Sequence, residues 1–122
     1  MFYRIFRVFD MKELIEWEDF AKIDIRSGTI LDAKINQKAR IPAYILTIDF
    51  GDLGMKTSSA QLTQNYLPSD LIGKKIAAVV NFPIKKIAGV KSEVLVLATV
   101  YDTKGTLLLS VDPLALNGSC VK

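Results

Sequence analysis

The stretch from residue 74 to residue 98, KKIAAVVNFPIKKIAGVKSEVLVLA, holds two short apolar runs on either side of a basic loop. The runs, Ile76 to Val80 and Val94 to Ala98, are each long enough for one buried strand and too short to span a membrane. Between them Pro83 lacks a backbone donor, which excludes an ordinary tight hairpin, and Gly89 can adopt a positive φ. The pattern predicts two core strands that hold out a loop.

This loop concentrates positive charge. From residue 74 to residue 92 the chain has five lysines and no acid, whereas the net charge of the whole chain is only +3. A small basic excess is weak support for a polyanionic partner, and the placement of the charge on one face counts for more. The loop therefore favours a binding function over a catalytic one.

Composition narrows the class of protein further. The 122 residues, half of them hydrophobic, suffice for one domain with a core. The absence of histidine and the single cysteine, Cys120, exclude a disulfide within the chain and a metal site built on histidine and cysteine. There is no nucleophile elbow and no phosphate-cradling glycine motif. We expect a cytoplasmic protein without signal peptide, membrane insertion, metal, cofactor or enzymatic activity.

Strands predominate in the rest of the chain. We expect a short helix over residues 12–21, a strand over 23–35 with a bulge or bend at Gly28, and strands over 43–50 and 55–60. A short helix stopped by Pro68 follows, then strands over 76–81, 94–100 and 106–111, the last two joined by a turn at 102–105. This order fits a mainly β fold, a five- to six-stranded Greek-key barrel of the OB type with short helices at the N-terminus and before strand four. Periodicity alone does not select it over other small barrels.

The domain boundary is placed near Met11. Residues 1–11 are treated as an N-terminal extension and residues 12–122 as one domain. Residues 1–9, MFYRIFRVF, fit a strand or a helix equally well, so an upstream extension and a genuine structural segment both remain open.

Several short strings keep a fixed order and spacing from about residue 14 to the C-terminus. They are DIRSGTI at 24–30, DFG at 49–51, YLP at 66–68, LIGKK at 71–75, VNFP at 80–83 and GVKSE at 89–93. Together they resemble the tRNA-binding domain family, an OB-fold module that occurs alone and appended to some aminoacyl-tRNA synthetases. The resemblance implies an OB barrel with a tRNA-binding surface.

Other strings resemble one branch of that family, the CsaA-type protein-export chaperones. They are KTSSAQLT at 56–63, SEVLVL at 92–97, WEDF at 17–20 and NG at 117–118. Two departures stand out, since residues 1–10 have no counterpart and Ile84 stands where a second proline is expected. This resemblance implies a homodimer that binds unfolded preprotein or the export machinery; the alternative is a structure-specific module that recognises the phosphates and shape of tRNA.

Candidate RNA-binding residues are lysines, which attract phosphate, and neutral hydrogen-bonding residues around them. They are Lys56, Ser58, Ser59, Gln61, Asn81, Lys85, Lys86, Lys91 and Ser92. Few aromatic residues lie among them, so shape and phosphate recognition would have to dominate over base stacking. A solvated lysine-rich loop is the plain alternative.

Candidate residues for peptide binding or dimerisation are apolar and lie outside the predicted strands. They are Leu14, Trp17, Phe20, Phe82, Ile84, Ile87, Leu114 and Leu116. Exposure of several such side chains favours association, because burial of each contributes roughly 1.5–3 kcal/mol. For each single residue, the alternative to binding or dimerisation is that its side chain packs in the core.

Overall fold

The computed structural model describes residues 11–122, so the segment predicted as an N-terminal extension lies, apart from Met11, outside the described residues. The helices are α1 (Trp17–Ala21), the single 3₁₀ turn η1 (Gly51–Leu53) and α2 (Pro68–Leu71). The strands are β1 (Ile25–Ile35), β2 (Tyr44–Asp49), β3 (Met55–Ala60), β4 (Lys75–Val79), β5 (Lys85–Ile87), β6 (Val90–Ser92), β7 (Leu95–Val96), β8 (Ala98–Tyr101), β9 (Gly105–Leu108) and β10 (Cys120–Val121).

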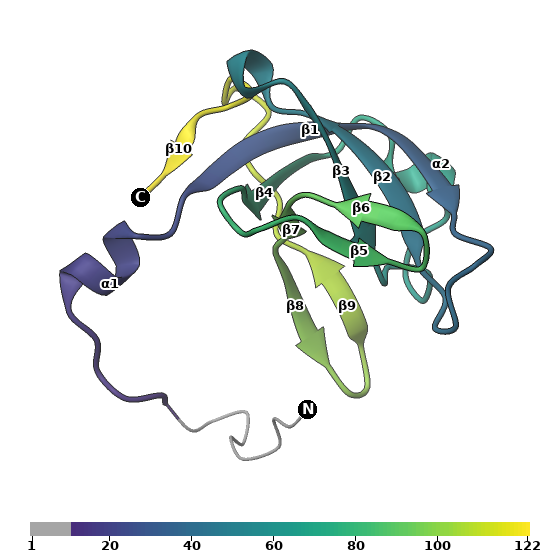
Figure 1. Cartoon of the computed structure of the whole chain (residues 1–122), viewed down its shortest axis with the longest axis horizontal. Coiled ribbons are helices and arrows are strands. Elements are labelled where there is room, and N and C mark those ends of the chain that lie inside the picture. The colour runs from purple at the N-terminus through teal and green to yellow at the C-terminus, as the bar shows by residue number, and fades with distance from the viewer. Residues whose placement is uncertain (1–10) are drawn as a thin grey trace.

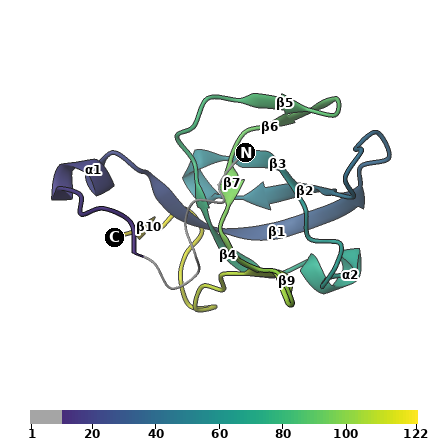
Figure 2. The same cartoon turned by 90° about the horizontal axis from the view of Figure 1, so that it is seen from below.

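The main sheet is a nearly closed antiparallel barrel (Figure 1). Its strands follow the order β3-β2-β1-β4-β7, and β10 pairs with the start of β1. Two separate hairpins complete the fold: β5–β6 lies over β3, and β8–β9 extends from the barrel (Figures 1 and 2). The prediction of a mainly β fold of the OB type is confirmed.

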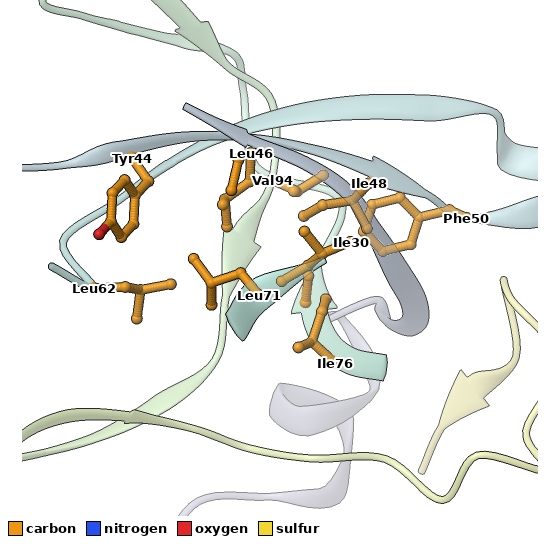
Figure 3. Packing of buried hydrophobic residues seen from close by; sticks show 11 residues of the cluster. Ile30, Tyr44, Leu46, Ile48, Phe50, Leu62, Leu71, Ile76 and Val94 are labelled. Atoms are coloured by element: carbon orange, nitrogen blue, oxygen red, sulfur yellow. The ribbon is translucent and has the colours of Figure 1, made fainter. Parts of the chain in front are cut away.

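The core fills the barrel with alternate residues of its strands. In β2 the side chains of Tyr44, Leu46 and Ile48 are buried and the residues between them are half-buried, as a strand with one face on the core requires. Leu71 of α2 is fully buried and lies between Leu62 and Ile30 in the core (Figure 3). The Tyr44 hydroxyl donates a 2.6 Å hydrogen bond to the carbonyl of Tyr66, so the polar tip of this buried ring is satisfied.

Gly28 allows β1 to cross the core closely. A Cβ added there would lie 2.8 Å from side-chain atoms of Ile48 and Phe50, nearer than packed carbon atoms approach. The predicted bulge at Gly28 is misplaced, because the register shift against β2 lies between Ile30 and Asp32. Gly28 therefore serves close packing rather than a change of register.

Three other element predictions need correction. The helix over 12–21 is confined to α1, and none of its residues is buried, so it does not cover the core. Pro68 begins α2 at its first turn instead of stopping a helix, because proline lacks only an N–H that this position leaves unpaired anyway. The strand predicted over 94–100 is divided into β7 and β8, which pair in different sheets.

Candidate functional site

The basic loop forms a hairpin, β5–β6, which we call the lysine hairpin (residues 85–92). Ala88 and Gly89 turn the chain with positive φ angles of 47° and 83°. The register places Lys86 directly opposite Lys91, and both side chains are exposed. Like charges at directly opposite positions destabilise a strand pair. A bound anion would relieve this repulsion.

The lysine hairpin is joined to the barrel at the edge of β3. The backbone N–H of Ser59 donates to Oγ of Ser92 at 3.0 Å. The Glu93 N–H donates to the Thr57 carbonyl, and the Thr57 N–H donates to Oε2 of Glu93, both at 2.8 Å. These contacts hold the hairpin over β3 (Figure 2).

An apolar groove lies between the lysine hairpin and β7, and we call it the hairpin groove. It has a volume of about 410 Å³ and is lined by Ser59, Phe82, Pro83, Lys85, Ile87, Ser92, Glu93, Val94 and Leu95. Phe82 is 56% exposed and Leu95 50% exposed, so large apolar surfaces face solvent beside a cation. Of the three apolar residues predicted in this loop, Phe82 and Ile87 line the groove. Ile84 is exposed but does not line it.

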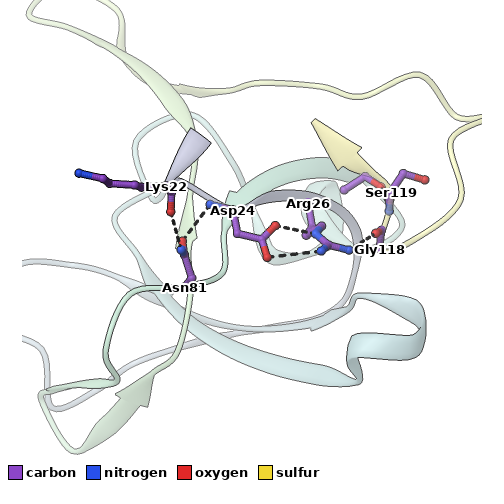
Figure 4. Close-up of polar contacts among 7 residues, drawn as sticks. Lys22, Asp24, Arg26, Asn81, Gly118 and Ser119 are labelled. Carbon is purple, nitrogen blue, oxygen red and sulfur yellow. Dashed lines mark hydrogen bonds and ion pairs between the residues drawn. The ribbon is translucent and has the colours of Figure 1, made fainter. Parts of the chain in front are cut away.

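Asn81 ties the start of the basic loop to the segment before β1. Its Oδ1 accepts from the N–H of Asp24 at 3.0 Å, and its Nδ2 donates to the carbonyl of Lys22 at 2.8 Å (Figure 4). Both ends of the amide are therefore engaged within the chain. We assign Asn81 a positioning role. The side chain is exposed, and Oδ1 and Nδ2 each keep capacity for one more hydrogen bond, so the predicted contact with RNA stays a prediction.

Asp24 and Arg26, at the start of β1, form an ion pair. Nε of Arg26 donates to Oδ1 of Asp24 at 2.6 Å, and Nη1 donates to the Gly118 carbonyl at 3.0 Å (Figure 4). The hydrogen bond from the guanidinium to the Asp24 carboxylate raises the pKa of Arg26. Arg26 thus links the start of β1 to the C-terminal segment and presents no free charge at the hairpin.

The remaining predicted RNA-binding residues lie on β3 and at its end. Ser58 is only 1% exposed, and its Oγ donates to the Val94 carbonyl at 3.0 Å, so it is buried in the barrel and away from any exposed surface. Lys56 and Ser59 are half-buried, whereas Gln61 is exposed. The structure therefore brings Ser59 and Gln61 close to the lysine hairpin, which contains Ser92, and keeps Ser58 buried.

Two further cations, not among the predicted residues, lie beside the hairpin tip. The side chain of Asn36 accepts from the Lys38 N–H at 3.1 Å and donates to the Ala88 carbonyl at 3.4 Å. This joins the β1–β2 loop, with Lys38 and Arg40, to the turn of the lysine hairpin. Both cations line a groove of about 350 Å³ that Ser59, Gln61 and Ile87 also line. The basic composition of residues 36–42 was the only signal in the sequence, and it does not reveal this contact.

The apolar residues predicted for dimerisation lie at the two ends of the chain and are exposed. Leu14 is 94% exposed, Trp17 67%, Leu114 90% and Leu116 78%. Trp17 and Phe20 pack on each other with ring centroids 5.5 Å apart. They line a groove of about 450 Å³ with Ile23, Ile25, Cys120 and Val121, which we call the helix groove. α1 lies to one side of the barrel (Figure 1).

Within residues 11–122, no group of three or more histidine, cysteine or acidic residues is arranged to hold a metal ion. Over the same residues, no helix is long and apolar enough to cross a membrane.

The comparisons with known proteins agree with this geometry. The family model of the tRNA binding domain matches residues 25–119. The crystal structure of the chaperone CsaA from Bacillus anthracis str. Ames is 49% identical and superimposes with a TM-score of 0.85, over 90% of this chain and 100% of that one. The CsaA chaperone protein from Picrophilus torridus is 48% identical with a TM-score of 0.84, over 89% and 100% of the two chains.

A methionine–tRNA ligase from Flavobacterium johnsoniae is 34% identical over 110 residues, which are 90% of this chain and 15% of the ligase. A second methionine–tRNA ligase, from Methanococcoides burtonii, is matched over 16% of its length. The chain thus spans about a sixth of the length of such ligases. The match is to one domain of a longer enzyme. On the family match and the two solved chaperones, the chain belongs to the tRNA-binding domain family and is similar to its CsaA chaperones.

Proposed function

We propose that this protein is a homodimeric, CsaA-like chaperone that binds unfolded polypeptides before export. The observation that carries the proposal is the hairpin groove, where Phe82, Ile87 and Leu95 expose apolar surface in a concave site. Exposed and concave apolar surfaces are typical of protein-binding sites. The similarity to solved CsaA chaperones supports the same reading.

We propose that the dimer forms through α1 and the C-terminal segment. In a single chain α1 buries none of its residues, and Leu114 and Leu116 face solvent. Their burial against a second copy would contribute roughly 1.5–3 kcal/mol for each large side chain. A two-fold arrangement would also place two hairpin grooves on one assembly. Residues 1–10, which lie outside the described residues, are proposed to extend the same interface.

Two measurements test this function. Light scattering at micromolar concentration should give twice the monomer mass of 13.6 kDa, and a monomer would refute the dimer. The purified protein should slow the aggregation of a chemically denatured client, whereas the variant Phe82→Ser should do so less, because it removes apolar surface without touching the core. Equal protection by both proteins would exclude the hairpin groove as the site.

A second function, binding of tRNA, is favoured by one specific observation. Lys86 and Lys91 lie opposite each other on the exposed face of the lysine hairpin, with Lys38 and Arg40 beside its tip. Such a cluster suits the phosphate backbone of a folded RNA. Filter binding of total tRNA at rising salt tests it: affinity that does not fall with salt, or no binding at low salt, would exclude this function.

We further propose that the protein works in the cytoplasm and acts by binding, without catalysing a reaction. The chain contains no histidine and no recognisable nucleophile motif, and general acid–base catalysis near neutral pH most often uses histidine. Hydrolysis of ester, amide or phosphate test substrates above the rate of the Phe82→Ser variant would contradict this proposal.

A further inference from the structure

The barrel closes imperfectly between β3 and β7, and we call this gap the seam. In the antiparallel ladder between β2 and β3, backbone groups of alternate residues point away from β2. Those of Thr57 and Ser59 point outward, as their bonds to Glu93 and Ser92 show. These partners precede β7, and among the described residues no hydrogen bond links β3 to β7 itself. The seam therefore opens from Ser59 onward.

Two backbone groups at the open part of the seam have no partner in residues 11–122. They are the carbonyl of Ser59, on the outward edge of β3, and the N–H of Gln61, the first residue after β3. Ser59 is half-buried and Gln61 exposed, and both residues line the groove that contains Lys38 and Arg40. One acceptor and one donor with this spacing match the backbone of an added antiparallel strand.

Apolar side chains continue along the seam. A groove of about 380 Å³ runs there, lined by Ser59, Ala60, Gln61, Leu62, Leu95, Val96, Leu97, Ala98, Val100 and Thr106, and we call it the seam groove. It shares Ser59 and Leu95 with the hairpin groove, so the two grooves lie next to each other. Among the residues that line it, Val100 is 77% exposed. In an extended chain every second side chain points to the same face, so alternate apolar side chains would pack against this lining.

The charge around these adjoining grooves indicates which extended chains fit best. Lys85 lines the hairpin groove, and Lys38 and Arg40 lie beside Ser59 and Gln61. The one acid that lines these grooves, Glu93, is engaged by the Thr57 N–H. The surroundings are thus net positive, and acidic residues on either side of an apolar segment would be attracted.

We propose that the client polypeptide binds by strand addition: an extended apolar segment with acidic flanks pairs with Ser59 at the end of β3 and with Gln61 just after it, and lays its side chains into the seam groove. This deepens the chaperone function and rests on it. Backbone pairing supplies affinity for many sequences, because every residue except proline carries the same donor and acceptor. The apolar lining and the cations then select among them.

The first test uses peptides with the intact protein. The probe is a fluorescein-labelled seven-residue peptide of alternating valine and threonine with a glutamate at each end, measured by anisotropy. Two further versions carry N-methyl groups on alternate amides, in one register or in the other. One register should lose about tenfold in affinity, since it removes the bonding donors, and the other should bind within about twofold of the parent. Equal losses, or none, would overturn strand addition.

The second test removes the N–H of Gln61. Gln61→Pro deletes this donor, which makes no bond within the described chain, and Gln61→Ala is the matched control that keeps it. Gln61→Pro should bind the peptide about fivefold more weakly than Gln61→Ala. Equal binding by two folded variants would overturn the proposal; if Gln61→Pro does not fold, the N-methyl peptides decide.

A third measurement separates this proposal from the chaperone function itself. If the protein slows client aggregation but binds all three peptides equally or not at all, the chaperone function stands and strand addition fails. If it neither slows aggregation nor binds the peptides, both fail. A version of the parent peptide with lysines in place of the glutamates should bind more weakly; equal binding would refute the proposed preference for acidic flanks.

Discussion

The cross-strand pair of Lys86 and Lys91 gives the sharpest prediction for RNA binding. We expect the double variant Lys86→Gln, Lys91→Gln to bind tRNA more weakly and with a smaller salt dependence. Each phosphate contact contributes about 0.9 to the slope of log affinity against log salt on a duplex and about 0.7 on a single strand. Two lost contacts therefore lower the slope by about 1.4 to 1.8.

Over the range from about 50 to about 200 mM salt, this change in slope reduces the loss of affinity by roughly tenfold. The assay is filter binding or anisotropy with labelled tRNA at four salt concentrations. The same variant should unfold at a slightly higher temperature, because the two like charges lie opposite each other and repel in the free protein.

The matched control changes the net charge by the same amount elsewhere. Lys34→Gln with Lys104→Gln removes two lysines, one exposed on β1 and one in the turn between β8 and β9. This variant should keep the slope of the wild-type protein within about 0.5. If both double variants lower the slope equally, the effect comes from net charge alone, and the assignment of the phosphate site to the lysine hairpin is refuted.

Three other changes test the fold and the assembly. Gly28→Ala should lower the free energy of unfolding by about 1–3 kcal/mol, since its Cβ would overlap Phe50, and an unchanged urea midpoint would show that the core can give way. Ser58→Ala should cost about 1–3 kcal/mol by leaving the Val94 carbonyl without its partner, measured by the same denaturation; a neutral result would mean that water replaces the hydroxyl. Cys120→Ser should leave the oligomeric state unchanged in light scattering with or without reducing agent, and a shift to monomer would show that the thiol takes part in assembly.

Much of the barrel was predictable from local patterns. The alternation of Tyr44, Leu46 and Ile48 gave β2 almost to its ends, and the polar stretch after it gave β3 over the same residues, Met55–Ala60. The turn before Gly105 was also predicted, and the structure has a positive φ of 71° there. These features depend on neighbours in sequence, which explains why the sequence alone indicates them.

The errors have two causes: one deciding contact lies far along the chain, and the other is the local start of a helix. The run from Val94 to Val100 is continuous in sequence, but β7 pairs with β4 and β8 with β9, so it divides. The helix predicted over residues 12–21 is shorter because only α1 has capping contacts, from Glu16 and Asp19. Its apolar residues face no core within the described chain.

The sequence by itself determined the mainly β fold, the family and the concentration of lysines in one loop, because alternation, motif order and composition are all written along the chain. Only the tertiary structure decided which polar residues are exposed. Ser58 is buried, whereas Asn81 stays exposed although its amide is hydrogen-bonded within the chain. Asn36 brings Lys38 to the lysine hairpin through its bond to Ala88, which lies 52 residues further along the chain. The open seam at Ser59 and Gln61 is likewise a property of strand pairing. A backbone group is paired or free according to the strand beside it, and that strand comes from a distant part of the sequence.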